Sequence, residues 1–392
     1  MISSLLDTDW YKLTMRQAVE AAWPGTTARY RLFLRGTEQP VESAFENQFQ
    51  AGIEALADLK LTEDEAAWLR AETDLPDDAV TSLKAFRFQP EQVEMAVDEE
   101  GRITLDITGP WTDTILWEVP VLAVLTELYY REVARDWSVD LDAYRQRSAD
   151  KARRLSEAGC RFAEFGTRRR RSLAIQEACL AGLMDGSGDQ ALTGTSNVDQ
   201  ARRNGLKPIG TIAHEWVMAH AGLVSVAEAN PAAFSRWIEV SPTRPRIALT
   251  DTYTVDLFCA TMRPGLTAAY DGFRHDSGDP FAFADRIIGW LEGQGIDPAA
   301  RMLVFSDSVT VDRAIQIQRH VDGRCGVSFG IGGHFTHDFN HPPRLDPVIK
   351  LVEINGTPVA KTTDEPDKAT GHPDSLESTR AAVSAALQHY ER

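Results

Sequence analysis

The chain has 392 residues, of which 43% are hydrophobic and 25% are charged, as is typical of a globular protein with a large core. Its formal net charge of −17 argues against a nucleic-acid partner, because binding to a phosphate backbone requires a broad basic surface. The N-terminal residues do not form a signal-peptide pattern, no apolar run approaches the length of a membrane span, and the four cysteines are far apart. We therefore expect a cytoplasmic protein with reduced cysteines, no structural metal and no membrane contact.

The first 135 residues predict an α+β arrangement. Residues 28–35 predict a strand that ends at Arg35, and apolar residues at helical spacing between positions 45 and 56 predict a helix. Residues 62–65 have the pattern of a capping box, and the alternating runs 93–97 and 103–107 predict a hairpin. Residues 111–135 are largely apolar and helical in pattern, with an interruption at Pro120, which suits a connector between domains.

From residue 136 the pattern changes to short apolar runs, most of them followed by helical sequence. The runs are residues 160–166, 191–192, 208–212, 247–249, 270–273, 302–305 and 327–329. Alternating strands and helices predict a parallel sheet. Because nearly every run ends in polar or glycine residues, we expect a (β/α) barrel rather than an open doubly wound sheet, whose chemistry concentrates at one switch point. After the barrel, residues 348–356 and 359–361 predict another hairpin, and residues 375–391 predict a terminal helix.

A histidine, His214, follows the apolar run 208–212 at the start of a helical segment, which is where α/β folds place their chemistry. His214-Glu215 resembles the start of a zinc-protease motif, but the next histidine, His220, is six residues away instead of four. Six residues turn a helix by about 600°, so the two rings lie on separate faces and zinc is excluded at this spacing. Taken alone, this stretch also fits a partly buried histidine bonded to a backbone carbonyl.

Three further clusters have the chemistry of an anion site, and each has a structural alternative. In residues 274–279 a carboxylate beside Ser-Gly suits sugar hydroxyls and an arginine suits an anion, but a salt-bridged turn is the alternative. Residues 330–333 offer backbone N–H groups to a phosphate, as glycine-rich loops do. The four arginines 168–171 suit a polyphosphate, or else form a solvated helix face.

Short motifs in a fixed order make the sequence resemble the nicotinate phosphoribosyltransferase family. They are residues 6–12 (LDTDWYK), 86–88 (FRF), 109–111 (GPW), 116–120 (LWEVP), 165–169 (FGTRR), 194–197 (GTSN), 210–215 (GTIAHE), 248–251 (ALTD), 274–279 (RHDSGD), 304–307 (VFSD) and 329–332 (FGIG). The resemblance covers nearly the whole chain, and a chance match to so many ordered motifs is negligible.

The resemblance implies an α/β fold made of an irregular (β/α) barrel of the type II phosphoribosyltransferase kind and an α+β N-terminal domain completed by the C-terminal segment. The corresponding divisions are residues 1–135, 136–345 and 346–392. It further implies ATP-coupled transfer of the phosphoribosyl group from phosphoribosyl pyrophosphate (PRPP) to nicotinate, through a phosphorylated His214. The resemblance also implies that nicotinate mononucleotide and pyrophosphate are the products, that Mg²⁺ accompanies PRPP, and that the protein is a homodimer with shared active sites.

By the same resemblance, the catalytic residues are His214, Glu215, Arg274 and Asp276, with Glu215 orienting the imidazole. Nicotinate would contact Tyr11, Phe165, Ser196, Thr211 and Arg274, with Tyr11 supplied by the same or the other subunit. PRPP and its phosphates would contact Arg35, Arg168, Arg169, Ser277, Gly278, Asp279, Ser306, Asp307, Gly330, Gly332, Gly333 and Lys361, and Asp279 would lie near Mg²⁺. Gly333 and Thr363 replace a threonine and a serine that are frequent in the family, which affects phosphate affinity rather than reaction type.

Two other functions stay open at this point. The related nicotinamide enzyme has an acidic residue in the Gly-Thr motif where this chain has Ser196. A carboxylate there would repel nicotinate by about 4 kcal/mol for charges about 4 Å apart at an effective dielectric constant of about 20, so we expect the acid to be the substrate. The other alternative is a catalytically silent barrel that binds phosphate as a metabolite sensor, which the intact His214, Arg274 and Asp276 argue against.

Overall fold

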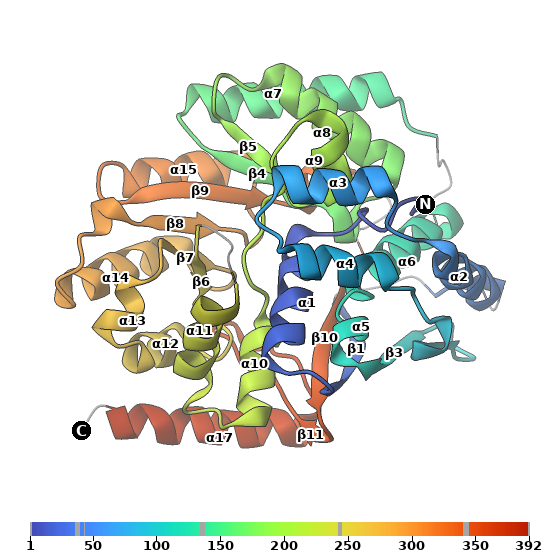
Figure 1. Cartoon of the computed structure of the whole chain (residues 1–392). Helices are drawn as coiled ribbons and strands as arrows, with labels where there is room; N and C mark the ends of the chain where they lie inside the picture. Colours follow the sequence, from blue (N-terminus) through green and yellow to red (C-terminus); the bar gives the residue numbers. More distant parts are fainter. Residues whose placement is uncertain are drawn as a thin grey trace.

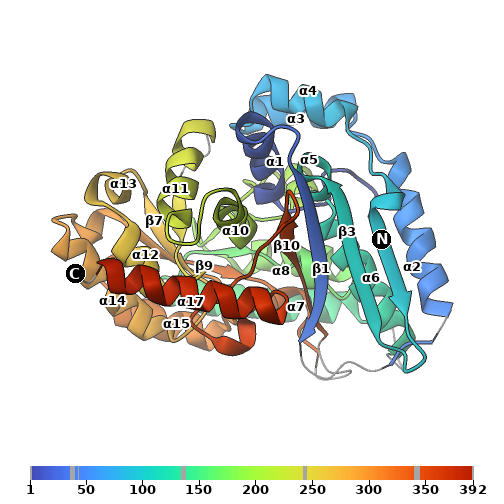
Figure 2. The same cartoon turned by 90° about the horizontal axis from the view of Figure 1, so that it is seen from below.

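The computed structural model describes residues 2–35, 40–42, 44–133, 138–241, 245–339 and 345–390. The chain is an α/β protein built on one antiparallel and one parallel sheet, with helices packed around both (Figure 1). Figure 2 shows α17 (Pro373–Tyr390) crossing the underside of the molecule, where it packs against α12 (Val255–Thr261).

The antiparallel sheet has the strand order β11-β10-β1-β3-β2. Its strands are β1 (Thr27–Arg35), β2 (Val93–Val97), β3 (Ile103–Pro110), β10 (Asp346–Ile354) and β11 (Thr357–Pro358). The predicted hairpins are thereby confirmed, and the C-terminal one joins the N-terminal sheet because β10 pairs with β1 from Ala28↔Ile354 to Arg35↔Asp346. This pairing brings the start of β10 beside the end of β1.

The helices of the N-terminal part are α1 (Trp10–Ala22), α2 (Ala44–Glu54), α3 (Glu63–Glu72), α4 (Asp77–Ala85), α5 (Trp111–Thr114) and α6 (Glu118–Val133). The predicted capping box is confirmed, since Thr62 and Glu65 bond reciprocally at the start of α3. The apolar stretch that begins at residue 111 forms two helices, with Pro120 in the first turn of α6, where a missing N–H costs no hydrogen bond. The predicted domain boundary after residue 135 lies outside the described residues.

The parallel sheet has the order β5-β4-β9-β8-β7-β6. Its strands are β4 (Phe162–Glu164), β5 (Leu192–Thr195), β6 (Ile247–Leu249), β7 (Gly272–His275), β8 (Met302–Phe305) and β9 (Gly326–Ile331). The helices around it are α7 (Leu141–Glu157), α8 (Leu173–Gly186), α9 (Val198–Asn204), α10 (His214–Leu223), α11 (Ala229–Val240), α12, α13 (Pro264–Ala268), α14 (Pro280–Gly293), α15 (Val311–Val321) and α16 (Gly333–Thr336).

One predicted barrel strand is wrong. Residues 208–212 contribute only a single parallel bridge, between Thr195 and Pro208, so no ladder closes the sheet between β5 and β6 in the described part of the chain. Pro208 has no N–H to donate to a ladder. Gly210 packs instead against α1, where an added Cβ would lie 2.9 Å from the Tyr11 backbone nitrogen. The predicted run 270–273 also begins too early, because β7 starts at Gly272.

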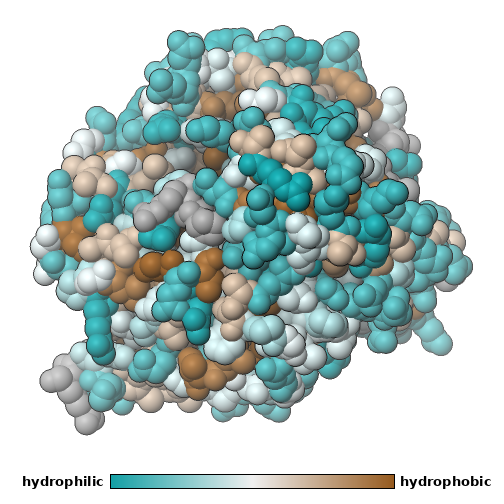
Figure 3. Space-filling view, viewed as in Figure 1, coloured by the Kyte–Doolittle hydropathy of each residue, from teal (hydrophilic) through white to brown (hydrophobic). Residues whose placement is uncertain are grey.

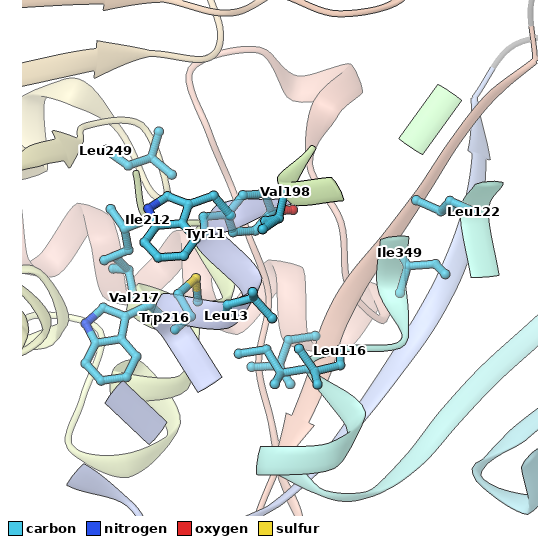
Figure 4. Close-up of a cluster of buried hydrophobic side chains, with 14 of the residues drawn as sticks. Tyr11, Leu13, Leu116, Leu122, Val198, Ile212, Trp216, Val217, Leu249 and Ile349 are labelled. Carbon is cyan, nitrogen blue, oxygen red and sulfur yellow. The ribbon is translucent and has the colours of Figure 1, made fainter. Parts of the chain in front are cut away.

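A continuous hydrophobic core joins the two sheets. Figure 4 shows part of it, where Tyr11 of α1, Trp216 of α10, Leu249 of β6 and Ile349 of β10 contribute to one buried cluster. This packing fixes the first turn of α10, which begins with His214, against both sheets. The face seen in Figure 3 is largely hydrophilic with scattered hydrophobic residues. Among the described residues, no helix combines the length and the apolar character needed to cross a membrane.

Candidate active site

A cavity of about 360 Å³ lies where the carboxyl ends of β4, β7, β8 and β9 face β10. It collects side chains that are far apart in the sequence. The predicted site residues that line it are Arg35, Phe165, Arg168, Arg169, Arg274, Asp276, Ser306, Asp307, Gly332, Gly333 and Lys361. A smaller cavity of about 40 Å³ shares Arg168, Arg274 and Asp276 with the first and is lined also by Tyr11, His214 and Glu215. The parallel strands thus bring most of the predicted residues together, as the common edge of a parallel sheet requires.

His214 is buried at the start of α10, and both ring nitrogens have polar neighbours. Nε2 lies 3.0 Å from Asp276 Oδ2, and Nδ1 lies 3.1 Å from Thr252 Oγ1. Burial, and then the positive charge of Lys361, lower the pKa of His214 to about 4, which outweighs the opposing effect of Asp276. The imidazole is therefore neutral at physiological pH and keeps a lone pair on one nitrogen.

Glu215 does not orient this imidazole, contrary to the sequence-based expectation. Its Oε1 lies 2.5 Å from Lys12 Nζ, and both side chains are buried. Consecutive residues of a helix point about 100° apart, so Glu215 faces α1 while His214 faces the strand ends. Asp276 and Thr252 are the groups that hold the ring.

Asp276 links His214 to Arg274. Its Oδ1 accepts hydrogen bonds from Arg274 Nη2 at 2.9 Å and from Ser306 Oγ at 2.8 Å. Burial alone would raise the pKa of Asp276, but the Arg274 guanidinium and the His214 ring outweigh it and hold the pKa well below the usual range. Arg274 also donates to Thr211 Oγ1 at 3.2 Å, so the hydroxyl predicted to meet nicotinate lies beside the predicted arginine.

Cationic side chains dominate the larger cavity. Arg168 and Arg169 lie in the short 3-10 turn that follows β4, and Arg169 pairs with Asp346 at 2.8 Å. Lys361 Nζ is buried 3.8 Å from Asp251, and Lys368 pairs with Asp307 at 2.6 Å. Local positive charge therefore faces this cavity although the chain as a whole is acidic.

Several predicted phosphate contacts lie outside both cavities. Ser277 Oγ bonds to Asp251 and to Thr363 Oγ1, and the Gly278 N–H donates to Glu365 Oε1 at 2.7 Å. Asp279 caps the start of α14 and accepts from the Phe281 N–H. Ser277 and Gly278 meet protein partners because the segment after Lys361 crosses over the end of β7.

Gly330 makes room for an aromatic ring and does not face the cavity. An added Cβ would lie 2.5 Å from two Phe165 ring carbons, so only glycine lets the ring pack against β9. Gly332 and Gly333, in contrast, line the larger cavity at the end of the same strand. In this glycine-rich stretch, the first glycine therefore accommodates a ring, and the later two line the cavity.

The neighbours of Ser196 and Tyr11 differ from those expected from the sequence. Ser196 Oγ donates to Asp9 Oδ1 at 2.7 Å, so a carboxylate stands beside the serine that was expected to spare nicotinate a negative charge. Burial raises the pKa of Asp9, while Arg168 opposes the rise. Tyr11 lies on its own chain's Arg168, with 5.9 Å between ring and guanidinium centre, and lines the smaller cavity, whereas Phe165 lines the larger one.

Sequence reasoning missed four residues that line or support the cavities, namely Thr252, Lys350, Glu118 and Lys12. Lys350 interrupts the apolar run of β10, a signal that a side chain faces a polar space. Burial lowers the pKa of Lys350 to about 7, although Glu118 opposes that shift. Glu118 belongs to a recognised motif, but nothing in the sequence indicates its partners.

The described residues include no group of three or more histidine, cysteine, aspartate or glutamate side chains arranged to hold a metal. Asp279, the residue expected near Mg²⁺, lines neither cavity.

Comparison with known proteins identifies the family. The model of the nicotinate phosphoribosyltransferase (NAPRTase) family matches residues 160–389, and that of the NAPRTase N-terminal domain matches residues 6–126. The chain is 41% identical to the nicotinate phosphoribosyltransferase of Methanosarcina acetivorans, over 96% of each chain, and 39% identical to that of Chromohalobacter salexigens, over 98% of this chain and 99% of the relative.

Solved structures of nicotinate phosphoribosyltransferases are also similar to this chain. The nicotinate phosphoribosyltransferase from Porphyromonas gingivalis superposes with a TM-score of 0.92 at 33% identity, covering 98% of this chain and 100% of that one. The nicotinate phosphoribosyltransferase from Vibrio cholerae superposes with a TM-score of 0.91 at 35% identity, covering 100% of this chain and 97% of that one. The chain belongs to the nicotinate phosphoribosyltransferase family of enzymes.

Proposed function

We propose that this enzyme transfers the phosphoribosyl group of PRPP to nicotinate, a reaction of NAD salvage, and couples the transfer to ATP hydrolysis through a phosphorylated His214. In the transfer, a bond forms between the pyridine nitrogen and the ribose anomeric carbon, and the bond from that carbon to pyrophosphate breaks. The observation that carries the proposal is a neutral, buried histidine held by Asp276 beside a strongly cationic cavity.

The larger cavity has the charge that a pyrophosphate group requires. Its described lining includes seven arginine or lysine side chains and four aspartates, in a chain of net charge −17. Arg168, Arg169, Lys350 and Lys361 are the groups that we propose for the phosphates, together with the backbone N–H groups of Gly332 and Gly333. The same cations assist departure of pyrophosphate by stabilising its developing negative charge.

Nicotinate requires an aromatic surface and a group for its carboxylate. We propose that Phe165 provides the surface, and that Arg274 with Thr211 binds the carboxylate. Arg274 already contacts Asp276, so the substrate carboxylate and Asp276 would share one guanidinium.

Phosphorylation of His214 would place about two negative charges next to Asp276 and Arg274. Those charges redistribute the hydrogen bonds of Arg274 and so change the affinity for PRPP. Couplings between sites of this kind are typically about 1–3 kcal/mol. In this way ATP hydrolysis favours product formation although the phosphoryl group on His214 does not contact nicotinate.

Five further features are part of the proposal. The strands β4 to β9 belong to an irregular barrel of the type II phosphoribosyltransferase kind, and the domain divisions are those expected from the sequence. Mg²⁺ is carried by PRPP, the enzyme is cytoplasmic, and it is a homodimer. Arg35 and Lys361 line the cavity of their own chain, so a partner subunit is not needed to supply them.

The test is a competition assay with PRPP, ATP and equal concentrations of nicotinate and nicotinamide. Pyrophosphate release measures turnover, and mass spectrometry of the mononucleotide identifies the base used. We expect nicotinate mononucleotide as the dominant product and a lower KM for PRPP when ATP is present. A clear preference for nicotinamide would refute the assignment, and absence of pyrophosphate release would support a silent phosphate-binding barrel.

A further inference from the structure

The carboxylate of Glu118 binds two cations from different parts of the chain. Its Oε2 lies 2.6 Å from Nζ of Lys12 in α1, and its Oε1 accepts a hydrogen bond from Nη1 of Arg168 at 3.1 Å. The hydroxyl of Tyr11 also donates to Oε2, at 3.4 Å. Glu118 is 5% exposed and Lys12 is fully buried, so these contacts are made away from water.

The contacts continue on the other side of Lys12. Its Nζ also meets Oε1 of Glu215, the residue after His214. Arg168, Glu118, Lys12 and Glu215 therefore form a row of alternating charges that ties the turn after β4 to α6, α1 and α10. Alternation leaves each desolvated charge beside an opposite one, which is the condition under which buried charges are tolerated.

Arg168 is the member of this row that reaches the cavities. Its side chain is 30% exposed and lines both of them. A second carboxylate, Asp9, lies farther away, with 3.5 Å between Asp9 Oδ2 and Arg168 Nε. Glu118 thus makes the closer carboxylate contact, on one edge of the guanidinium, and the remaining N–H groups are left for a ligand.

We propose that Glu118 is a positioning residue for the pyrophosphate group of PRPP, acting by fixing the guanidinium of Arg168 toward the larger cavity. The proposal rests on the proposed function, since it assumes that this cavity binds pyrophosphate. Glu118 itself is a poor neighbour for an anion, because its carboxylate lines the smaller cavity and carries a negative charge. Its presence there is explained by orientation of Arg168 and not by attraction of the ligand.

Substitution of Glu118 separates these two effects by sign. In Glu118→Gln, removal of a negative charge alone would tighten the binding of an anion. Loss of the orienting contact would weaken it, because the guanidinium gains alternative rotamers that must be lost again on binding. We expect the second effect to dominate, with the Kd of inorganic pyrophosphate and the KM of PRPP raised by about fivefold or more and kcat little changed.

Two controls make the result specific. Glu127→Gln changes a buried carboxylate farther along α6 that pairs with Arg131, and it should leave both constants unchanged. In an Arg168→Ala background, Glu118→Gln should no longer weaken binding, because the orienting effect acts through Arg168 and only the tightening from the removed charge remains. Near-ultraviolet circular dichroism confirms that each variant is folded.

An unchanged or lower Kd for pyrophosphate in Glu118→Gln would overturn the inference, as would an undiminished effect in the Arg168→Ala background. If Glu118→Gln does not fold, the comparison of Tyr11→Phe with wild type decides the matter: the OH of Tyr11 donates to Glu118, and its loss should raise the same Kd by a smaller factor. An equal Kd for Tyr11→Phe and wild type would then overturn it. Failure of the proposed function is a separate outcome, since wild type itself would then release no pyrophosphate from PRPP with nicotinate.

Discussion

Replacing Lys12 with methionine should destabilise the protein strongly, because this lysine is the cation between two buried carboxylates. Its Nζ lies 2.6 Å from Glu118 and 2.5 Å from Glu215, and its side chain has no exposed surface. Each pair is worth about 4 kcal/mol at a separation of about 4 Å and an effective dielectric constant of about 20. The cost of burying the ammonium offsets part of this sum, which leaves an expected loss of about 3–5 kcal/mol, as for other broken buried pairs.

The assay is unfolding in guanidinium chloride, followed by tryptophan fluorescence at several pH values. Burial raises the pKa of Glu118, but Lys12 outweighs it and is the main cause that lowers this pKa to about 2. Without Lys12 the pKa of Glu118 rises in the folded state, so the folded variant binds protons that the folded wild type does not. The difference from wild type should therefore be largest near pH 8 and should shrink toward pH 5. Lys84→Met is the control, since Lys84 pairs with the largely exposed Glu63 and solvent screens such a pair. A loss for Lys12→Met no larger than for Lys84→Met, or one independent of pH, would refute the reasoning.

Three other predictions concern the site. Gly330→Ala should displace the Phe165 ring, because the new Cβ would lie 2.5 Å from it, and should raise the KM of nicotinate several-fold. Gly289→Ala is the control, because its new Cβ would meet no atom within 4 Å, and it should leave that KM unchanged. Thr252→Val removes the hydroxyl at Nδ1 of His214 and should slow phosphorylation of the enzyme by ATP, because the activation free energy should rise by about 1–3 kcal/mol. An unchanged rate of phosphorylation would contradict this role of Thr252. Lys350 has a pKa of about 7 in the folded protein, so it loses its charge as the pH rises through 7, and the affinity for pyrophosphate should fall between pH 6 and 8. Lys350→Met should make this affinity depend less on pH. An equally steep pH profile in the variant would contradict the role of Lys350.

The sequence predicted the elements whose signals are local. The run 302–305 and the strand Met302–Phe305 coincide, because four apolar residues are followed directly by a polar strand end. The joining of β10 to β1 could not be predicted from spacing alone, because it pairs residues more than 300 positions apart, as between Ala28 and Ile354. That part of the expectation came from the resemblance to a family.

The candidate site was predicted in outline for a related reason. Parallel strands end at one edge of a sheet, so Arg274 near the end of β7, Asp276 directly after it and Ser306 after β8 had to be neighbours. The direction of individual side chains could not be predicted in this way. Glu215 follows His214 in the sequence, yet its partner Lys12 lies 203 positions away on another helix.

Glycine is the other case in which sequence was insufficient. Gly330 and Gly332 belong to the same short motif, but the first faces the ring of Phe165 and the second faces the cavity. A glycine-rich run indicates a close approach of backbone to something, without specifying whether that is a phosphate or a neighbouring ring.

His214 is proposed to carry a phosphoryl group during turnover, in the same site that binds the substrates. The most direct measurement is to incubate the enzyme with γ-labelled ATP, digest it at alkaline pH and locate the label by peptide mass spectrometry. We expect the label on the peptide containing His214, its loss in His214→Asn and its retention in His372→Asn, which changes a largely exposed histidine in the loop before α17. Label that persists in His214→Asn, or no label on an enzyme that turns over nicotinate, would contradict the account.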